Sequence, residues 1–164
     1  LGTPVQLQVT NNEASELYLS VLVIDPTGEI SVIFPNQWTT AEQVTLVGAG
    51  QTLKIPDPNK DNFRLVTQEP KGVAEVLILA SRTPLRSAIQ AIREIAVSGG
   101  QRSGPITLSS SGQSSEPADV IDNLLDDVNN GTRGSTSKAT PTRSTVRNID
   151  ASQLAALSIT FEVI

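Results

Sequence analysis

Strict alternation of apolar and polar residues marks both ends of this chain and constrains its fold more than any other feature. Near the start, Val5, Leu7 and Val9 alternate with polar residues, and the same pattern runs from Leu157 to Val163 near the end. A period of two places successive side chains on opposite faces of a strand, one on a core and one in water. Each end therefore predicts a strand, and the last strand must return to a sheet built by the earlier part of the chain.

A hairpin is expected between these ends. The apolar run 17–24 precedes Asp25-Pro26-Thr27-Gly28, which suits a type I turn, and 30–34 forms the return strand. Pro35 should end that strand, because proline has no N–H for the ladder. Four further short runs are bounded by glycine or proline, and we interpret them as strands: 44–47, 51–55, 63–67 and 73–80.

Two helices and two linkers complete the expected organisation. Thr83 and Pro84 suit the start of a helix whose apolar stripe covers 85–96, and Pro117 opens a second stripe over 120–128. Segments 98–115 and 129–147 are rich in Ser, Thr and Gly, as linkers are, and should add little to a core.

The fold class that follows is mainly β. We expect a β-sandwich or open barrel of about seven short strands with two accessory helices. The chain is expected to be one β-rich accessory domain over 1–164, with its core in 4–97 and 154–164 and a helix and low-complexity insertion in 98–150.

The amino-acid composition excludes most catalytic chemistry. The 164 residues include no cysteine and no histidine, which excludes thiol nucleophiles, disulfides, histidine bases and Cys/His zinc sites. The net charge of -5 opposes binding to nucleic acid, and 3% aromatic residues are too few for faces that stack bases or sugars. We expect no enzyme activity, no cofactor and no metal in this chain.

Two acidic patterns are candidate sites. Asp57, Asn59 and Asp61 have the spacing that begins an EF-hand loop, but Asn62 and Gln68 stand where that loop needs Gly and Glu, so a Pro/Asn turn is the better interpretation. Paired carboxylates of a hydrolase are the other possibility, but the apolar stripe takes the buried face of the second helix, so its acids should face solvent. These acids are Glu116, Asp119, Asp122, Asp126 and Asp127.

The most distinctive local cluster is Phe34-Pro35-Asn36 with Trp38. A lone tryptophan in a polar loop can anchor a partner in an interface, although a tryptophan that folds back to cap a sandwich is the commoner use. Phe34, Pro35, Asn36 and Trp38 are therefore the candidate partner contact.

Apolar stretches such as 21–24 and 76–80 are far shorter than the roughly 20 residues that span a bilayer. The start of the chain has no apolar signal core. We expect a cytoplasmic domain without membrane insertion, and we interpret the methionine-free sequence as a piece of a longer protein.

Three segments carry a family resemblance: LYLSVLVIDPTGEISVIFP at 17–35, QTLKIP at 51–56 and EPKGVAEVLILAS at 69–81. Together they resemble a bacterial domain of unknown function that recurs beside caspase-like peptidase domains. The later segments TPLRSAIQAI, PADVIDNLLDDV and LAALSITFEVI resemble the C-terminal part of cyanobacterial caspase-family proteins of the metacaspase or orthocaspase type. The resemblance implies an upstream peptidase domain with a Cys/His site, and no catalytic residue carries over to this chain.

The expected function is a noncatalytic accessory or interaction domain of a caspase-like cysteine peptidase, for partner recognition, scaffolding or restraint of the protease. Its partner would be the attached peptidase domain or another protein, and a large exposed apolar patch would favour it. The alternative is a small-ligand or glycan-binding β-sandwich module, which would show a concave pocket with converging polar groups. A carboxylate-based hydrolase is a third possibility.

Overall fold

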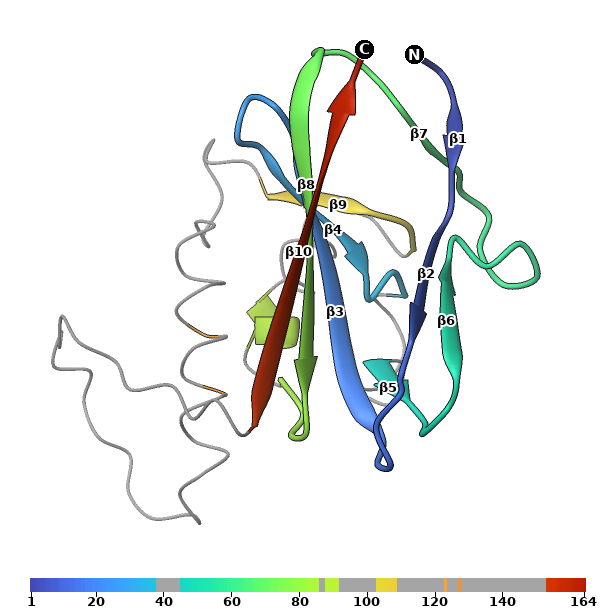
Figure 1. Ribbon diagram of the computed structural model, residues 1–164, viewed down its shortest axis with the longest axis vertical. Helices are drawn as coiled ribbons and strands as arrows, with labels where there is room; N and C mark the ends of the chain where they lie inside the picture. Colours follow the sequence, from blue (N-terminus) through green and yellow to red (C-terminus); the bar gives the residue numbers. More distant parts are fainter. Residues whose placement is uncertain (38–44, 86–87, 92–102, 109–122, 124–126, 128–152) are drawn as a thin grey trace, which may run out of the picture.

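The computed structural model describes residues 1–37, 45–85, 88–91, 103–108, 123, 127 and 153–164 (Figure 1). This part of the chain is mainly β, as predicted, and its sheets are not closed into a barrel. Its strands are β1 (Pro4–Val5), β2 (Leu7–Thr10), β3 (Leu17–Ile24), β4 (Ile30–Phe34), β5 (Leu46–Val47), β6 (Thr52–Ile55), β7 (Leu65–Val66), β8 (Gly72–Ser81), β9 (Ile106–Leu108) and β10 (Leu154–Val163).

The main sheet has six strands, and its path runs β10, β8, β3, β4, β9, with β5 paired to the start of β3. Every neighbouring pair is antiparallel. β3 lies between β8 and β4. Leu19 and Val21 belong to one buried cluster and Leu22 packs against another, which explains why the sequence of β3 is apolar on both faces. β10 pairs with β8 along its whole length, so the prediction that the last strand returns to the sheet is confirmed.

The β3–β4 hairpin forms at the predicted turn. Gly28 has a φ of 87°, which glycine adopts without steric cost, and donates its N–H to the Asp25 carbonyl at 2.9 Å. The Asp25 carboxylate accepts hydrogen bonds from the N–H groups of Thr27 (2.8 Å) and Glu29 (2.9 Å). β4 ends at Phe34, directly before the proline that was expected to stop it.

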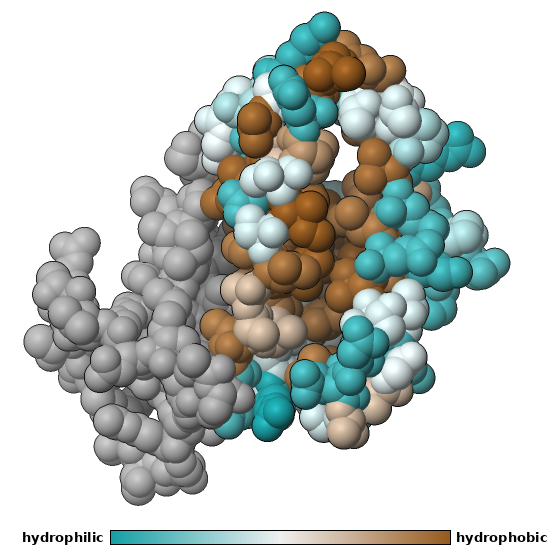
Figure 2. Space-filling model, viewed as in Figure 1, coloured by the Kyte–Doolittle hydropathy of each residue, from teal (hydrophilic) through white to brown (hydrophobic). Residues whose placement is uncertain are grey.

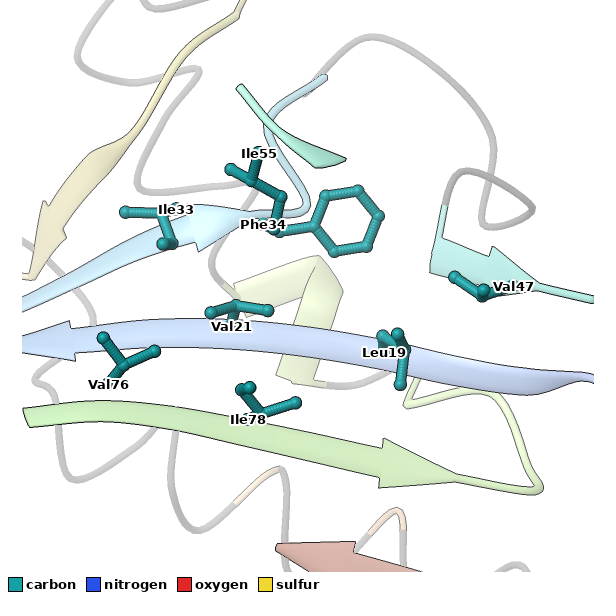
Figure 3. Close-up of a cluster of buried hydrophobic side chains, with 8 residues drawn as sticks. All are labelled: Leu19, Val21, Ile33, Phe34, Val47, Ile55, Val76 and Ile78. Carbon is teal, nitrogen blue, oxygen red and sulfur yellow. The ribbon is translucent and has the colours of Figure 1, made fainter. Parts of the chain in front are cut away.

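Two strand pairs, β2 with β6 and β1 with β7, form a second layer on the main sheet. From this layer Leu7, Val9, Leu53 and Leu65 pack against a buried apolar cluster. The cluster consists of Leu19, Val21, Ile33, Phe34, Val47, Ile55, Val76 and Ile78 (Figure 3). The fold is therefore an open sandwich with its main core between the two layers.

One part of the expected linker 98–115 is a strand, so the linker interpretation is wrong at β9. Ile106 and Leu108 are 4% and 5% exposed and form a second buried cluster with Val32 and Ala91. β9 pairs with β4, with Ile106 opposite Val32. Three residues inside a Ser- and Gly-rich segment are too short an alternation to recognise, and cross-strand packing on β4 stabilises them.

Most of the two expected helices, the whole expected linker 129–147 and Trp38 lie outside the described residues. Residues 88–91 are helical, and so are Asn123 and Asp127 at the place of the second helix. Leu85 and Ala88 are buried in one cluster, which agrees with the apolar stripe predicted for the first helix.

Candidate interaction surface

β10 carries an apolar row that the fold leaves uncovered. Leu157, Ile159 and Phe161, which we call the β10 row, are 57%, 47% and 37% exposed. In the register with β8 they lie opposite Ile78, Val76 and Ala74, which are all buried. Residues directly opposite each other in an antiparallel pair project from the same face. The core face of the main sheet therefore continues outward into side chains that contact water.

The second layer explains this exposure. Its strands pack on the cluster formed mainly by β3, β4 and β8. Neither the buried residues of that cluster nor the half-buried apolar residues packed against it include a residue of β10. Figure 2 shows apolar residues gathered in a hollow between the β8 and β10 side of the molecule and the side formed by β1, β2 and β6. The sandwich is open along this side.

Apart from the charge of Glu162, the outer edge of β10 lacks the features that normally protect an edge strand. Leu154–Val163 contains no proline, glycine, lysine or arginine, and its pairing with β8 runs over ten residues without a register shift. Natural edge strands are usually shortened, bulged or charged to prevent pairing with other chains. Within the described residues no strand pairs with the outer edge of β10, which ends the sheet path.

The opposite face of β10 is polar. Ser158, Thr160 and Glu162 alternate with the β10 row, and Thr160 lies opposite Glu75 of β8. The Ser158 hydroxyl donates a hydrogen bond to the Glu75 carboxylate. The Glu75 carboxylate thus lies beside two hydroxyl-bearing residues, whereas Glu162 lies opposite Val73.

The candidate contact Phe34-Pro35-Asn36 serves the fold itself. Phe34 is 5% exposed and belongs to the main core, and Pro35 is buried beside it. Asn36 is 4% exposed, donates its side-chain amide to the Asp61 carboxylate at 3.2 Å, and accepts the Gly104 N–H on its carbonyl at 2.8 Å. A partner could touch these three side chains only if the fold opened, and their burial could not be read from the turn sequence.

The segment 57–61 forms a turn, as interpreted. Asp57 accepts the Asn59 N–H on its carboxylate at 3.0 Å, and Asp61 accepts the Asp57 N–H at 2.7 Å. The hydrogen bond from Asn59, followed by the ammonium of Lys60, holds the pKa of Asp57 below its ordinary 3.8. In the part of the chain that the structure describes, no group of three or more acidic side chains is placed to hold a metal ion.

The expectation that the acids of the second helix face solvent is wrong for Asp127. Its side chain is half-buried, and its carboxylate accepts a hydrogen bond from the Ala88 N–H at 2.9 Å. A carboxylate is stabilised by the free N–H groups in the first turn of a helix. Asp127 therefore joins the two helical segments, while Glu116, Asp119, Asp122 and Asp126 lie outside the described residues.

Comparison with known protein families shows which family this chain matches. Residues 1–84, which contain β1 to β8, match the family model described as Domain of unknown function (DUF4384). A search of curated proteins and a search of solved structures each gave no match. No helix within the described residues has the length and apolarity needed to cross a membrane. The match covers just over half of the chain, and the chain therefore belongs to the DUF4384 family.

Proposed function

We propose that this chain is a noncatalytic interaction domain that binds a protein partner through the β10 row. One observation carries the proposal: three large apolar side chains continue the core face of the sheet and yet are 37% to 57% exposed. Contiguous apolar surface beside an open strand edge is typical of protein-binding sites. The absence of cysteine and histidine from the sequence supports a role in binding.

The partner that we propose is a caspase-like cysteine peptidase domain in the same parent protein. The resemblance of 17–35, 51–56 and 69–81 to a domain of unknown function that recurs beside such peptidases supports this choice. The domain would then recognise, scaffold or restrain its peptidase. A small-ligand or glycan site needs polar groups that converge in a pocket, whereas the β10 row is apolar, so its chemistry favours a protein partner.

Binding between separately expressed chains tests the proposal. The parent gene is sequenced upstream of Leu1, and the peptidase domain expected there is titrated with this chain. We expect binding that Ile159→Lys weakens at least about tenfold, because a lysine in the β10 row cannot be buried unpaired. Thr107→Lys on β9 is the matched control, since Thr107 is also exposed on a terminal strand of the sheet.

Two results would contradict the proposal. A parent gene without a peptidase domain removes the proposed partner, and equal binding by the wild-type chain and Ile159→Lys removes the proposed surface. Ile159 is 47% exposed, so Ile159→Lys should change the free energy of unfolding by less than about 0.5 kcal/mol. Urea unfolding of both variants confirms that lost binding does not reflect lost folding.

A further inference from the structure

The β10 edge has a definite geometry for a partner that is itself a strand. β10 is ten residues long, pairs with β8 in an unbroken register, and ends the sheet path. An extended segment can add to such an edge through backbone hydrogen bonds, and its alternate side chains then lie on the two faces of the sheet. The side chains of β10 therefore specify what the added strand should carry on each face.

On the face that carries the β10 row, the added strand should carry apolar residues. A strand added beside β10 places every second side chain next to Leu157, Ile159 and Phe161. Apolar side chains there would bury the β10 row and extend the main core outward. Burial of exposed apolar surface is the main source of affinity in such an arrangement.

On the face opposite the β10 row, the added strand should carry positive charge. Glu162 of β10 is exposed and Glu75 of β8 is half-buried, and their register places both carboxylates on the face opposite the β10 row. No lysine or arginine occurs in Leu154–Val163 or Gly72–Ser81 to balance them. Opposite charges on neighbouring strands stabilise a sheet, and like charges destabilise it.

Charge favours a basic strand over a second copy as the occupant. An antiparallel β10–β10 pair would add another Glu162 and no basic residue to this face, and each chain has a net charge of -5. A cationic strand instead meets complementary charge both locally and over the whole chain.

We propose that the outer edge of β10 binds an extended peptide segment with apolar residues at alternate positions and lysine or arginine between them. The segment adds as a new terminal strand of the main sheet. This inference rests on the proposed function, because it uses the same surface and names the chemistry of the partner.

Titration of the whole 164-residue chain with capped ten-residue peptides tests the inference. One peptide alternates valine with lysine, a second alternates valine with glutamate, and a third has the composition of the first in scrambled order. We expect the valine–lysine peptide to bind at least about tenfold more tightly than either of the others. Its affinity should fall as salt is added, because salt screens the attraction to Glu162 and Glu75.

Variants assign the binding to the edge of β10. Ile159→Lys should abolish measurable binding of the valine–lysine peptide, and Glu162→Gln should weaken it about two- to fivefold. Glu16→Gln is the matched control, because Glu16 is also exposed but lies beside the start of β3, at the end of the sheet remote from Glu162. We expect Glu16→Gln to leave the affinity unchanged.

Several results would overturn the inference. Equal binding of the valine–lysine peptide and its scrambled counterpart would show general attraction of a basic peptide to an acidic chain, and so would equal losses in Glu162→Gln and Glu16→Gln. Equal binding of the valine–glutamate peptide would show that the two carboxylates do not select the added strand. A dimer that sediments as such in the wild-type chain and dissociates in Ile159→Lys would make a second copy the occupant. A peptidase domain that binds through Ile159 while no peptide binds would overturn this inference but leave the proposed function intact. Binding of the valine–lysine peptide without binding of the peptidase domain would overturn the proposed function but leave this inference intact.

Discussion

Asn11 is a buried amide that joins three backbone segments. It is 3% exposed, and its amide nitrogen lies within hydrogen-bond distance of the carbonyls of Ser15 (2.9 Å), Val47 (2.9 Å) and Gly48 (3.2 Å). Its side-chain oxygen accepts the Glu13 N–H at 3.0 Å. One side chain thus connects the end of β2 to the loop before β3 and to the turn after β5. In sequence, Asn11 is only a polar residue that follows an alternating strand, so its burial could not be predicted.

Replacing Asn11 should destabilise the fold strongly. Asn11→Ala leaves buried carbonyls and one N–H without their partner, which costs about 2 to 4 kcal/mol of unfolding free energy. Urea unfolding measures this loss. Asn12→Ala is the matched control because Asn12 is exposed, and it should cost less than about 0.5 kcal/mol. Equal losses in the two variants would contradict the role assigned to Asn11.

Asp25 ties stability to pH at the β3–β4 turn. Hydrogen bonds, first that of the Thr27 hydroxyl, hold the pKa of Asp25 below its ordinary 3.8. Because the folded-state pKa is the lower one, the unfolded chain takes up the proton first as pH falls. The stabilisation by this carboxylate is therefore complete above pH about 4 and is lost as pH falls through the folded-state pKa.

Thr27→Val should raise the pKa of Asp25 toward 3.8, since it removes the largest cause of the shift. NMR titration of the Asp25 carboxyl carbon measures the change directly. Thr107→Val is the control, because the Thr107 hydroxyl contacts Ser31 and not Asp25. A pKa of Asp25 that is the same in all three chains would show that the Thr27 hydroxyl does not cause the shift.

At the scale of the elements, prediction from sequence worked where alternation and turn residues agreed. The β3–β4 hairpin, the short runs of β5 to β7 and the return of β10 all follow from such local patterns. β9 was missed because three residues carry little pattern by themselves and gain their stability from β4. The exposure of the β10 row could not be predicted from the sequence either. Alternation shows that one face of a strand is apolar, but it does not show whether another layer covers that face.

The strand β9 gives a prediction at this scale. Ile106 is 4% exposed in the cluster with Val32 and Ala91. Ile106→Ala should lower the free energy of unfolding by about 2 to 4 kcal/mol, because it leaves a cavity in a packed core. Thr107→Ala, the exposed neighbour on the same strand, should have a small effect in the same urea unfolding experiment. A small effect of both would mean that β9 adds little to the core.

At the scale of the whole molecule, the candidate site is a consequence of incomplete layering. The second layer covers the part of the main sheet around β3, and β10 extends the core face beyond it (Figures 1 and 2). Phe34, Pro35 and Asn36, the candidate contact predicted from the sequence, are buried in the fold. The exposed apolar surface lies instead on β10, the strand with the clearest alternation. A partner strand or domain would complete the sandwich along its open side.

Hydrogen exchange of the backbone amides tests the central claim, that the β10 row is the interaction surface, most directly. Exchange is measured for this chain alone and with the peptidase domain of its parent. The account predicts slower exchange in Leu154–Val163 on binding, with little change in β9 at the other end of the sheet path. Protection confined to other parts of the chain, with β10 exchanging as it does in the free domain, would contradict it.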